Sequence, residues 1–155
     1  MEVIDKIFGR KIYKGDVVYL KKKYFVDEKS AYDGVATVYY DIYRNEDNKK
    51  IGSTDLRLTI EGFMYYFGHI GYRIEEKYRG HNYSYYSTKL LFEIAYKEYG
   101  IKEIILTCSP ENTASCKVLQ KLGGEFVELV NVPKGHELYR LGETRKYVYK
   151  YKLNF

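Results

Sequence analysis

The sequence contains no tryptophan and only two prolines, two cysteines and two methionines in 155 residues. Cys108 and Cys116 are too few for a disulfide framework, and their spacing suits neither a zinc site nor a redox pair. We interpret them as reduced thiols and predict no metal site. Apolar runs of membrane-spanning length are missing, and Met1 to Lys6 lack the apolar core of a signal peptide. Together these absences predict a cytoplasmic protein without a membrane segment.

Tyrosine, by contrast, is abundant, with 20 residues. Tyrosine favours half-buried strand surfaces, where the ring packs while the hydroxyl stays hydrated, so a sheet-rich domain is expected. Lys and Arg exceed Asp and Glu by 26 to 21. This mild excess can steer anionic ligands, but it is too small to indicate nucleic acid by itself. A basic, tyrosine-rich nucleic-acid-binding protein is therefore kept only as an alternative. The length predicts a single domain over residues 1–155.

The first half of the chain has the pattern of strands. Aromatic and β-branched residues alternate or cluster in four segments, which are residues 17–26, 35–43, 51–58 and 65–74. Turn signals separate the first three segments, which indicates an antiparallel meander.

The second half alternates helices and strands. Apolar and aromatic residues recur at helical spacing over 83–99, and Gly100 ends that stripe. A buried strand over 104–107, a helix over 113–122 and closing strands over 125–132 and 144–153 follow. The order strand, helix, strand predicts a mixed α/β sheet that contains a parallel crossover.

The segment Glu75 to Ser84 connects a predicted strand to a predicted helix and carries the first chemical signal. Backbone N–H groups in the first turn of a helix have no intrahelical partners, and the helix dipole adds positive potential there. Gly80 lets the backbone approach a ligand, and Arg79 supplies a charge beside it. This pattern is typical of a phosphate-binding turn, and also of an ordinary tight turn.

A second motif resolves that ambiguity. Pro110-Glu111-Asn112-Thr113-Ala114-Ser115, followed by Leu119, Leu122 and Gly123, lies downstream of Arg79-Gly80-His81-Asn82-Tyr83-Ser84. In order and separation, the two motifs resemble those of the GCN5-related N-acetyltransferase (GNAT) superfamily. The resemblance covers roughly Gly68 to Val130. Asn82 stands where the family usually has glycine, and asparagine tolerates the left-handed backbone that this position requires.

The resemblance implies a three-layer α/β (α+β) fold with a central mixed, mostly antiparallel sheet of about six to seven strands and helices packed on it. The family normally inserts one or two helices near the N-terminus, where this chain offers only residues 27–34, so the N-terminal helices are expected to be reduced. The resemblance also implies acetyl-coenzyme A (acetyl-CoA) as co-substrate. The cofactor-binding residues that it implies are Tyr72, Arg73, Ile74, Arg79, Gly80, His81, Asn82, Tyr83, Ser84, Asn112 and Ser115.

By the same resemblance, a neutral primary amine attacks the thioester directly, while an acid protonates the leaving thiolate. Many members use a tyrosine seven residues after the motif asparagine as this acid, and here that position is Leu119. Ser115 is the predicted replacement, and its structural alternative is to satisfy local backbone groups in the first turn of the helix. Candidates for the base are Glu61, His69, Glu75 and Tyr139, of which Glu75 is taken forward. Loss of the tyrosine also leaves open a catalytically inactive, CoA-binding regulatory module.

The acceptor is not identified by sequence. A small molecule, a protein terminus and a lysine side chain all satisfy the implied amine chemistry, because acceptor specificity does not transfer with a fold. A homodimer formed through a sheet edge is a further possibility. The closing Tyr-rich strand and Gly123-Gly124 resemble those of bacterial members.

Overall fold

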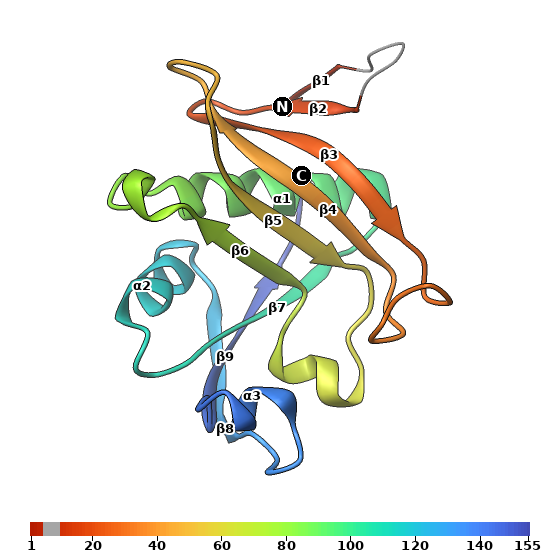
Figure 1. Ribbon diagram of the computed structural model, residues 1–155, viewed down its shortest axis with the longest axis vertical. Coiled ribbons are helices and arrows are strands. Elements are labelled where there is room, and N and C mark those ends of the chain that lie inside the picture. The colour runs from red at the N-terminus through yellow and green to blue at the C-terminus, as the bar shows by residue number, and fades with distance from the viewer. Residues whose placement is uncertain (5–9) are drawn as a thin grey trace.

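The computed structural model describes residues 1–4 and 10–155. Residues 5–9, which include the end of the N-terminal segment considered above, lie outside the described part. Two antiparallel sheets form the fold (Figure 1). The first, six-stranded sheet follows chain order and consists of β1 (Glu2–Ile4), β2 (Ile12–Lys14), β3 (Val18–Val26), β4 (Thr37–Arg44), β5 (Lys50–Arg57) and β6 (Ile70–Ile74). The second, with the order β7-β9-β8, consists of β7 (Glu103–Cys108), β9 (Arg145–Lys152) and β8 (Glu125–Asn131).

The helices are α1 (Tyr83–Tyr99), α2 (Thr113–Lys121) and α3 (Glu137–Arg140), with 3-10 helices η1 (Gly62–Tyr66) and η2 (Glu76–Tyr78). In the described residues, no α-helix precedes α1, as expected from the short segment 27–34. Within the same part of the chain, none of the helices combines the length and apolarity needed to cross a membrane. The expected α/β fold is therefore confirmed, but its sheet is divided in two, and the pairings between the described strands are all antiparallel, without the parallel pair expected from the crossover.

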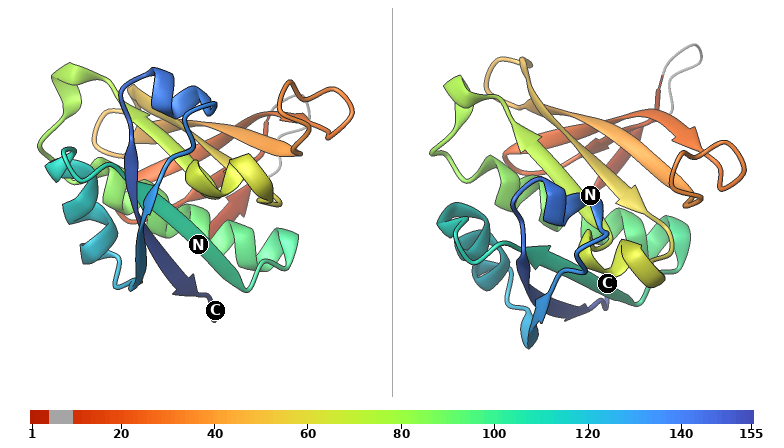
Figure 2. Two further views of the ribbon diagram at one scale, coloured as in Figure 1. Left: turned by 90° about the horizontal axis from the view of Figure 1, so that it is seen from below. Right: turned by 60° about the horizontal axis from the view of Figure 1, so that its bottom comes forward.

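Helix α1 organises the core. It starts after Asn82 and ends at Gly100, whose φ of 64° is the left-handed conformation that terminates helices. Leu91, Ile94 and Ala95 are fully buried and belong to one apolar cluster with residues of both sheets. Figure 2 shows α1 packed between the sheets. Burial of this stripe, rather than intrinsic helix propensity, is what fixes α1 in place.

The side of the first sheet that faces away from α1 carries a group of tyrosines. Side chains alternate along each strand, so Val38, Tyr40 and Ile42 of β4 face the core while Tyr39 and Tyr43 face away. In Figure 1, α1 lies behind the first sheet, so strands β3, β4 and β5 stand between the helix and the viewer. We call this side of the sheet the open face and define it by Tyr19, Tyr24, Tyr39, Tyr43 and Asp55.

Stacked pairs line the open face. The rings of Tyr19 and Tyr43 stack at 5.1 Å between centroids, and those of Tyr24 and Tyr39 at 4.7 Å. Each pair joins neighbouring strands directly across the sheet. Cross-strand aromatic pairs stabilise sheets by about 0.2–1 kcal/mol each, so part of the unusual tyrosine content has a structural cause.

The two sheets meet at one backbone junction. The His69 N–H donates to the Ile105 carbonyl at 2.9 Å, and the Ile105 N–H donates to Nδ1 of His69 at 2.9 Å. Beyond this point β6 and β7 belong to separate sheets. The strand predicted over 65–74 is shorter than expected, because η1 occupies its first part and Gly68, at φ 73°, breaks the extended chain.

The junction makes stability depend on pH. Burial lowers the pKa of His69 below its usual value of about 6.5, and its Nδ1 must keep a lone pair to accept the Ile105 N–H. Below about pH 6.5 the unfolded chain therefore binds a proton that the folded chain excludes. As the pH decreases, the free energy of unfolding decreases by at most about 1.4 kcal/mol per pH unit.

His69→Asn should remove this slope, because the amide oxygen of asparagine can accept the same N–H without ionising. Urea unfolding at pH 7.5 and pH 5.5 measures the difference. We expect the wild type to lose more stability on acidification than His69→Asn. An equal loss in both proteins would show that His69 does not titrate on unfolding.

Candidate active site

A cleft of about 360 Å³ lies where β6 separates from the second sheet. All predicted cofactor-binding residues except His81 line it. The structure adds Tyr78, Ala114 and Val118, which the sequence did not predict to bind the cofactor. The cleft thus collects residues from the end of β6, the turn before α1 and the start of α2. The first two segments follow one another in the sequence, and the fold brings the distant start of α2 to them.

Strand β6 contributes backbone groups to this cleft. It pairs with β5 on one side only and forms one edge of the first sheet. The Glu75 N–H donates to Ile51 and the Arg57 N–H to His69, so the odd-numbered residues of this segment bond towards β5. By the alternation of an antiparallel ladder, Tyr72 and Ile74 turn their N–H and C=O groups to the free edge.

The turn before α1 has the conformation that an anion site requires. Gly80 has φ 90° and Asn82 has φ 61°, so Asn82 adopts the left-handed conformation expected of it. The first turn of α1 contains no acidic residue, and the side chain of Asn82 does not cap it. The N–H groups at this end of α1 therefore keep their hydrogen-bonding capacity for a ligand.

Arg79 is fixed at the mouth of the cleft. Its Nε donates to the Ile74 carbonyl at 2.9 Å, across the η2 turn. Because Nε is held by the backbone, the rest of the guanidinium is left for a second, anionic partner. Strand edge, helix end and arginine thus surround one cleft.

Two hydroxyl groups meet inside the cleft. Tyr72 Oη lies 3.1 Å from Ser115 Oγ, although the residues are 43 positions apart. Burial raises the pKa of the Tyr72 hydroxyl, while its contact with Ser115 acts the other way. Ser115 is also held by Asn112, whose Oδ1 accepts the Ser115 N–H at 3.1 Å. Asn112 therefore caps α2 and orients the serine.

The base candidates do not meet at the cleft. Glu75 is exposed and lies next to Glu76 and Lys77, outside the residues that line it. Glu61 is exposed, and His69 is engaged by Ile105. The structure therefore adds no support to Glu75 as the base. Leu119, at the position of the family's tyrosine, is buried in the core.

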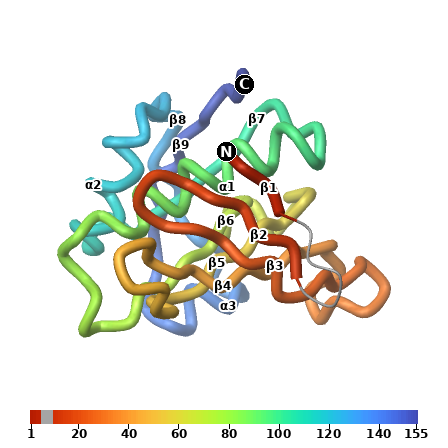
Figure 3. The backbone as a smooth tube through the Cα atoms, turned by 90° about the horizontal axis from the view of Figure 1, so that it is seen from above, coloured from red at the N-terminus to blue at the C-terminus, as the bar shows by residue number. Residues whose placement is uncertain are grey.

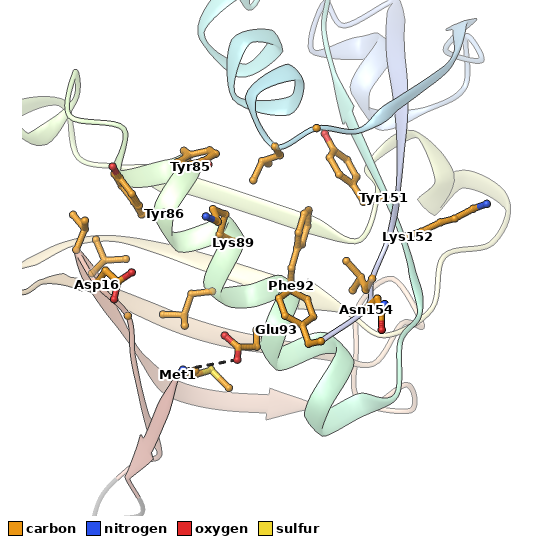
Figure 4. A pocket seen from close by; sticks show the side chains of 18 of the residues that line it. Met1, Asp16, Tyr85, Tyr86, Lys89, Phe92, Glu93, Tyr151, Lys152 and Asn154 are labelled. Carbon is orange, nitrogen blue, oxygen red and sulfur yellow. Dashed lines mark ion pairs between the residues drawn. The ribbon is translucent and has the colours of Figure 1, made fainter.

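A larger cavity of about 870 Å³ lies along the outer side of α1 (Figure 4). Tyr85, Lys89 and Phe92 of α1 form its floor, and the Met1 amino group approaches Glu93 Oε1 at 3.8 Å across it. Met1 and Phe155 both border it, and both chain ends are marked in Figure 3. None of the predicted cofactor residues lines this cavity. The hydroxyl pair and the turn before α1 line the smaller cleft instead.

Comparison with known proteins decides the family. The model of the acetyltransferase (GNAT) domain matches residues 19–125, which include both sequence motifs. The chain belongs to the GNAT family of N-acetyltransferases. The GNAT resemblance proposed from the motifs is thereby confirmed.

This GNAT chain is 34% identical over 83 residues to the uncharacterized N-acetyltransferase YnaD of Bacillus subtilis (strain 168). The match covers 48% of each protein, so it spans about half the length of that relative.

Solved structures share the GNAT fold. An acetyltransferase (GNAT family) from Bacillus anthracis superimposes with a TM-score of 0.65 at 16% identity, covering 91% of this chain and 98% of the other. RimL, a ribosomal L7/L12 alpha-N-protein acetyltransferase in complex with coenzyme A, gives 0.66 at 14% identity, covering 92% and 98%. At these identities the likeness concerns the fold.

Proposed function

We propose that this GNAT protein transfers the acetyl group of acetyl-CoA to a primary amine by direct attack on the thioester. The observation that carries the proposal is the free edge of β6 at Tyr72 and Ile74, which leads to the uncapped N-terminus of α1 within one cleft. That RimL has been solved with coenzyme A supports the same cofactor here.

The cleft residues fit the chemistry of the cofactor part by part. A pyrophosphate suits the N–H groups of the turn from Gly80 to Ser84 and the charge of Arg79. The amide groups of the pantetheine arm suit the backbone of Tyr72 and the N–H of Ile74 at the free edge of β6, in the manner of an added strand. The thioester would then lie near Tyr72 and Ser115.

In this arrangement the Tyr72–Ser115 pair supplies the acid. The neutral amine forms the C–N bond with the acetyl carbon, the C–S bond breaks, and the departing thiolate takes a proton from one hydroxyl of the pair. The new amide nitrogen loses one proton to water, and water returns a proton to that hydroxyl. This extends the role predicted for Ser115 to the side chain of Tyr72, which the sequence had indicated only for backbone contact.

An inactive, CoA-binding regulatory module is the second candidate function. The burial of Leu119 at 2% exposure favours it, because no side chain can donate a proton from that position. The two candidates agree on cofactor binding and differ on turnover. The prediction of a single domain over 1–155 applies to both.

The acceptor class remains that of primary amines: a small molecule, a protein N-terminus or a lysine. RimL acts, by its description, on the α-amine of a ribosomal protein, which supports including protein N-termini. The bacterial sources of the relatives support a bacterial, cytoplasmic setting for this proposal. A homodimer is part of the same set of proposals.

The test is calorimetric titration of acetyl-CoA and CoA into the protein, followed by thiol release from acetyl-CoA in the presence of an amine panel. Binding with amine-dependent release of CoA supports the acetyltransferase. Binding without release across the panel supports the regulatory module, and absence of binding would overturn both.

A further inference from the structure

Asp55 places a carboxylate on the open face next to the strand that lines the cleft. It is the cross-strand partner of Gly71 on β6 and of Tyr39 on β4. A methyl group built on Gly71 would lie 2.8 Å from Asp55 Oδ1, so the carboxylate rests directly on the backbone of β6. The side chain remains 21% exposed and is therefore accessible from the open face.

Arg57 holds this carboxylate in position. Its Nη2 lies 3.3 Å from Asp55 Oδ2, and its Nη1 donates to the Gly68 carbonyl at 3.0 Å. The guanidinium also lies over the Phe67 ring, 5.6 Å from the centroid. Arg57 is thus fixed by the turn that precedes β6, and it leaves Oδ1 of Asp55 over Gly71.

The charges around Asp55 favour a proton acceptor. Burial raises the pKa of the Asp55 carboxyl, Arg57 lowers it, and the charge of Asp33 raises it further. Tyr39, its cross-strand partner on β4, has a pKa that is raised first by burial and then by Asp55. A carboxylate beside an aromatic ring is a chemically suitable pocket for an alkylammonium ion.

Strand β6 separates this carboxylate from the hydroxyl pair. Tyr72 follows Gly71 directly, and successive side chains point to opposite faces, so the Tyr72 hydroxyl lies on the cleft side and Asp55 on the open side. Neighbouring strands are about 4.8 Å apart. A thioester at the edge of β6 would therefore have an acid on one face and a carboxylate one strand away on the other.

We infer that Asp55 binds the ammonium group of the acceptor on the open face and takes its proton before attack. The inference rests on the proposed function. The carboxylate removes one proton from R–NH3⁺, and the neutral amine forms the C–N bond as the C–S bond breaks. The hydroxyl pair protonates the thiolate, and the amide nitrogen and the protonated Asp55 each release one proton to water. The acceptor class is a cationic alkylamine, including a protein α-amine.

Two CoA thioethers test this without knowledge of the acceptor. S-(2-aminoethyl)-CoA places an ammonium group where the amine would approach, and S-ethyl-CoA is its uncharged counterpart. We expect the wild type to bind the aminoethyl compound about tenfold more tightly, from a charge-assisted hydrogen bond. In Asp55→Asn the ratio should fall below about twofold, while the Kd of S-ethyl-CoA stays unchanged.

Two further variants separate this role from folding. Asp33→Asn removes a nearby charge without touching Gly71, and it should keep most of the preference. Gly71→Ala displaces the carboxylate but keeps its charge, so it should lose the preference. It replaces Asp55→Asn in the test if that variant fails to fold.

An equal ratio in wild type, Asp55→Asn and Gly71→Ala, or no preference in a wild type that binds both compounds, would overturn the inference. Failure to bind either compound would instead overturn the proposed cofactor site.

Discussion

Ser84→Asp should weaken cofactor binding strongly without weakening the fold. Ser84 is the second residue of α1 and lines the cleft, and the first turn of the helix holds no acidic residue. A carboxylate there interacts favourably with the helix dipole, by about 0.3–1 kcal/mol, but it occupies the position proposed for the pyrophosphate and repels it. We expect the Kd for acetyl-CoA to rise about 100-fold, or about 2.8 kcal/mol.

Two control variants make the result specific. Ser84→Ala removes the hydroxyl without adding charge, and Ser30→Asp adds the same charge in the exposed loop between β3 and β4. Both should bind acetyl-CoA within about threefold of the wild type. Calorimetry gives the affinities and thermal melts the stability. A Ser84→Asp protein that binds normally would exclude the end of α1 as the anion site.

The double variant Tyr72→Phe/Ser115→Ala should bind acetyl-CoA but turn it over about 100-fold more slowly, the lower end of the usual contribution of a general acid. Each single variant leaves one hydroxyl in place, so its loss should be smaller. Because burial raises the pKa of Tyr72, this hydroxyl stays protonated throughout the range from pH 7 to 9, and the wild-type rate should not fall there through its ionisation.

Tyr78→Phe is the matched control, because Tyr78 also lines the cleft while the contact to Ser115 is made by Tyr72. Its kcat should stay within about threefold of the wild type. The rates are measured as CoA release with the best amine of the panel, and the affinities by calorimetry. A double variant that keeps the wild-type kcat would mean that water, rather than the hydroxyl pair, protonates the thiolate.

Local patterns predicted much of the fold. The helix expected over 83–99 has those bounds, because its apolar stripe and Gly100 are both encoded within a few residues. The helix expected over 113–122 ends at Lys121. The strand expected over 65–74 was too long, because its aromatic residues also suit η1, and only the positive φ of Gly68 and its approach to Ile105 decide between the two. The two sheets meet next to this contact, which joins residues far apart in the sequence and so is not encoded in a local pattern.

The candidate site divides in the same way. Its turn and helix ends are contiguous motifs, so the resemblance located them and the fold gathers them at one cleft. The Tyr72–Ser115 contact and the position of Asp55 over Gly71 depend on strand register and on packing between elements. In the sequence, Asp55 is one polar residue of an alternating strand, and nothing distinguishes it from a solvent-facing charge.

The free edge of β6 also bears on how the protein behaves without ligand. An unpaired strand edge is a template on which another extended chain can add, and in the proposed complex the pantetheine arm would cover it. The strand is only five residues long, and the guanidinium of Arg79 already occupies the Ile74 carbonyl at its end. Both features limit strand addition. Self-association of the empty protein through this edge should therefore be weak, and bound CoA should suppress it further.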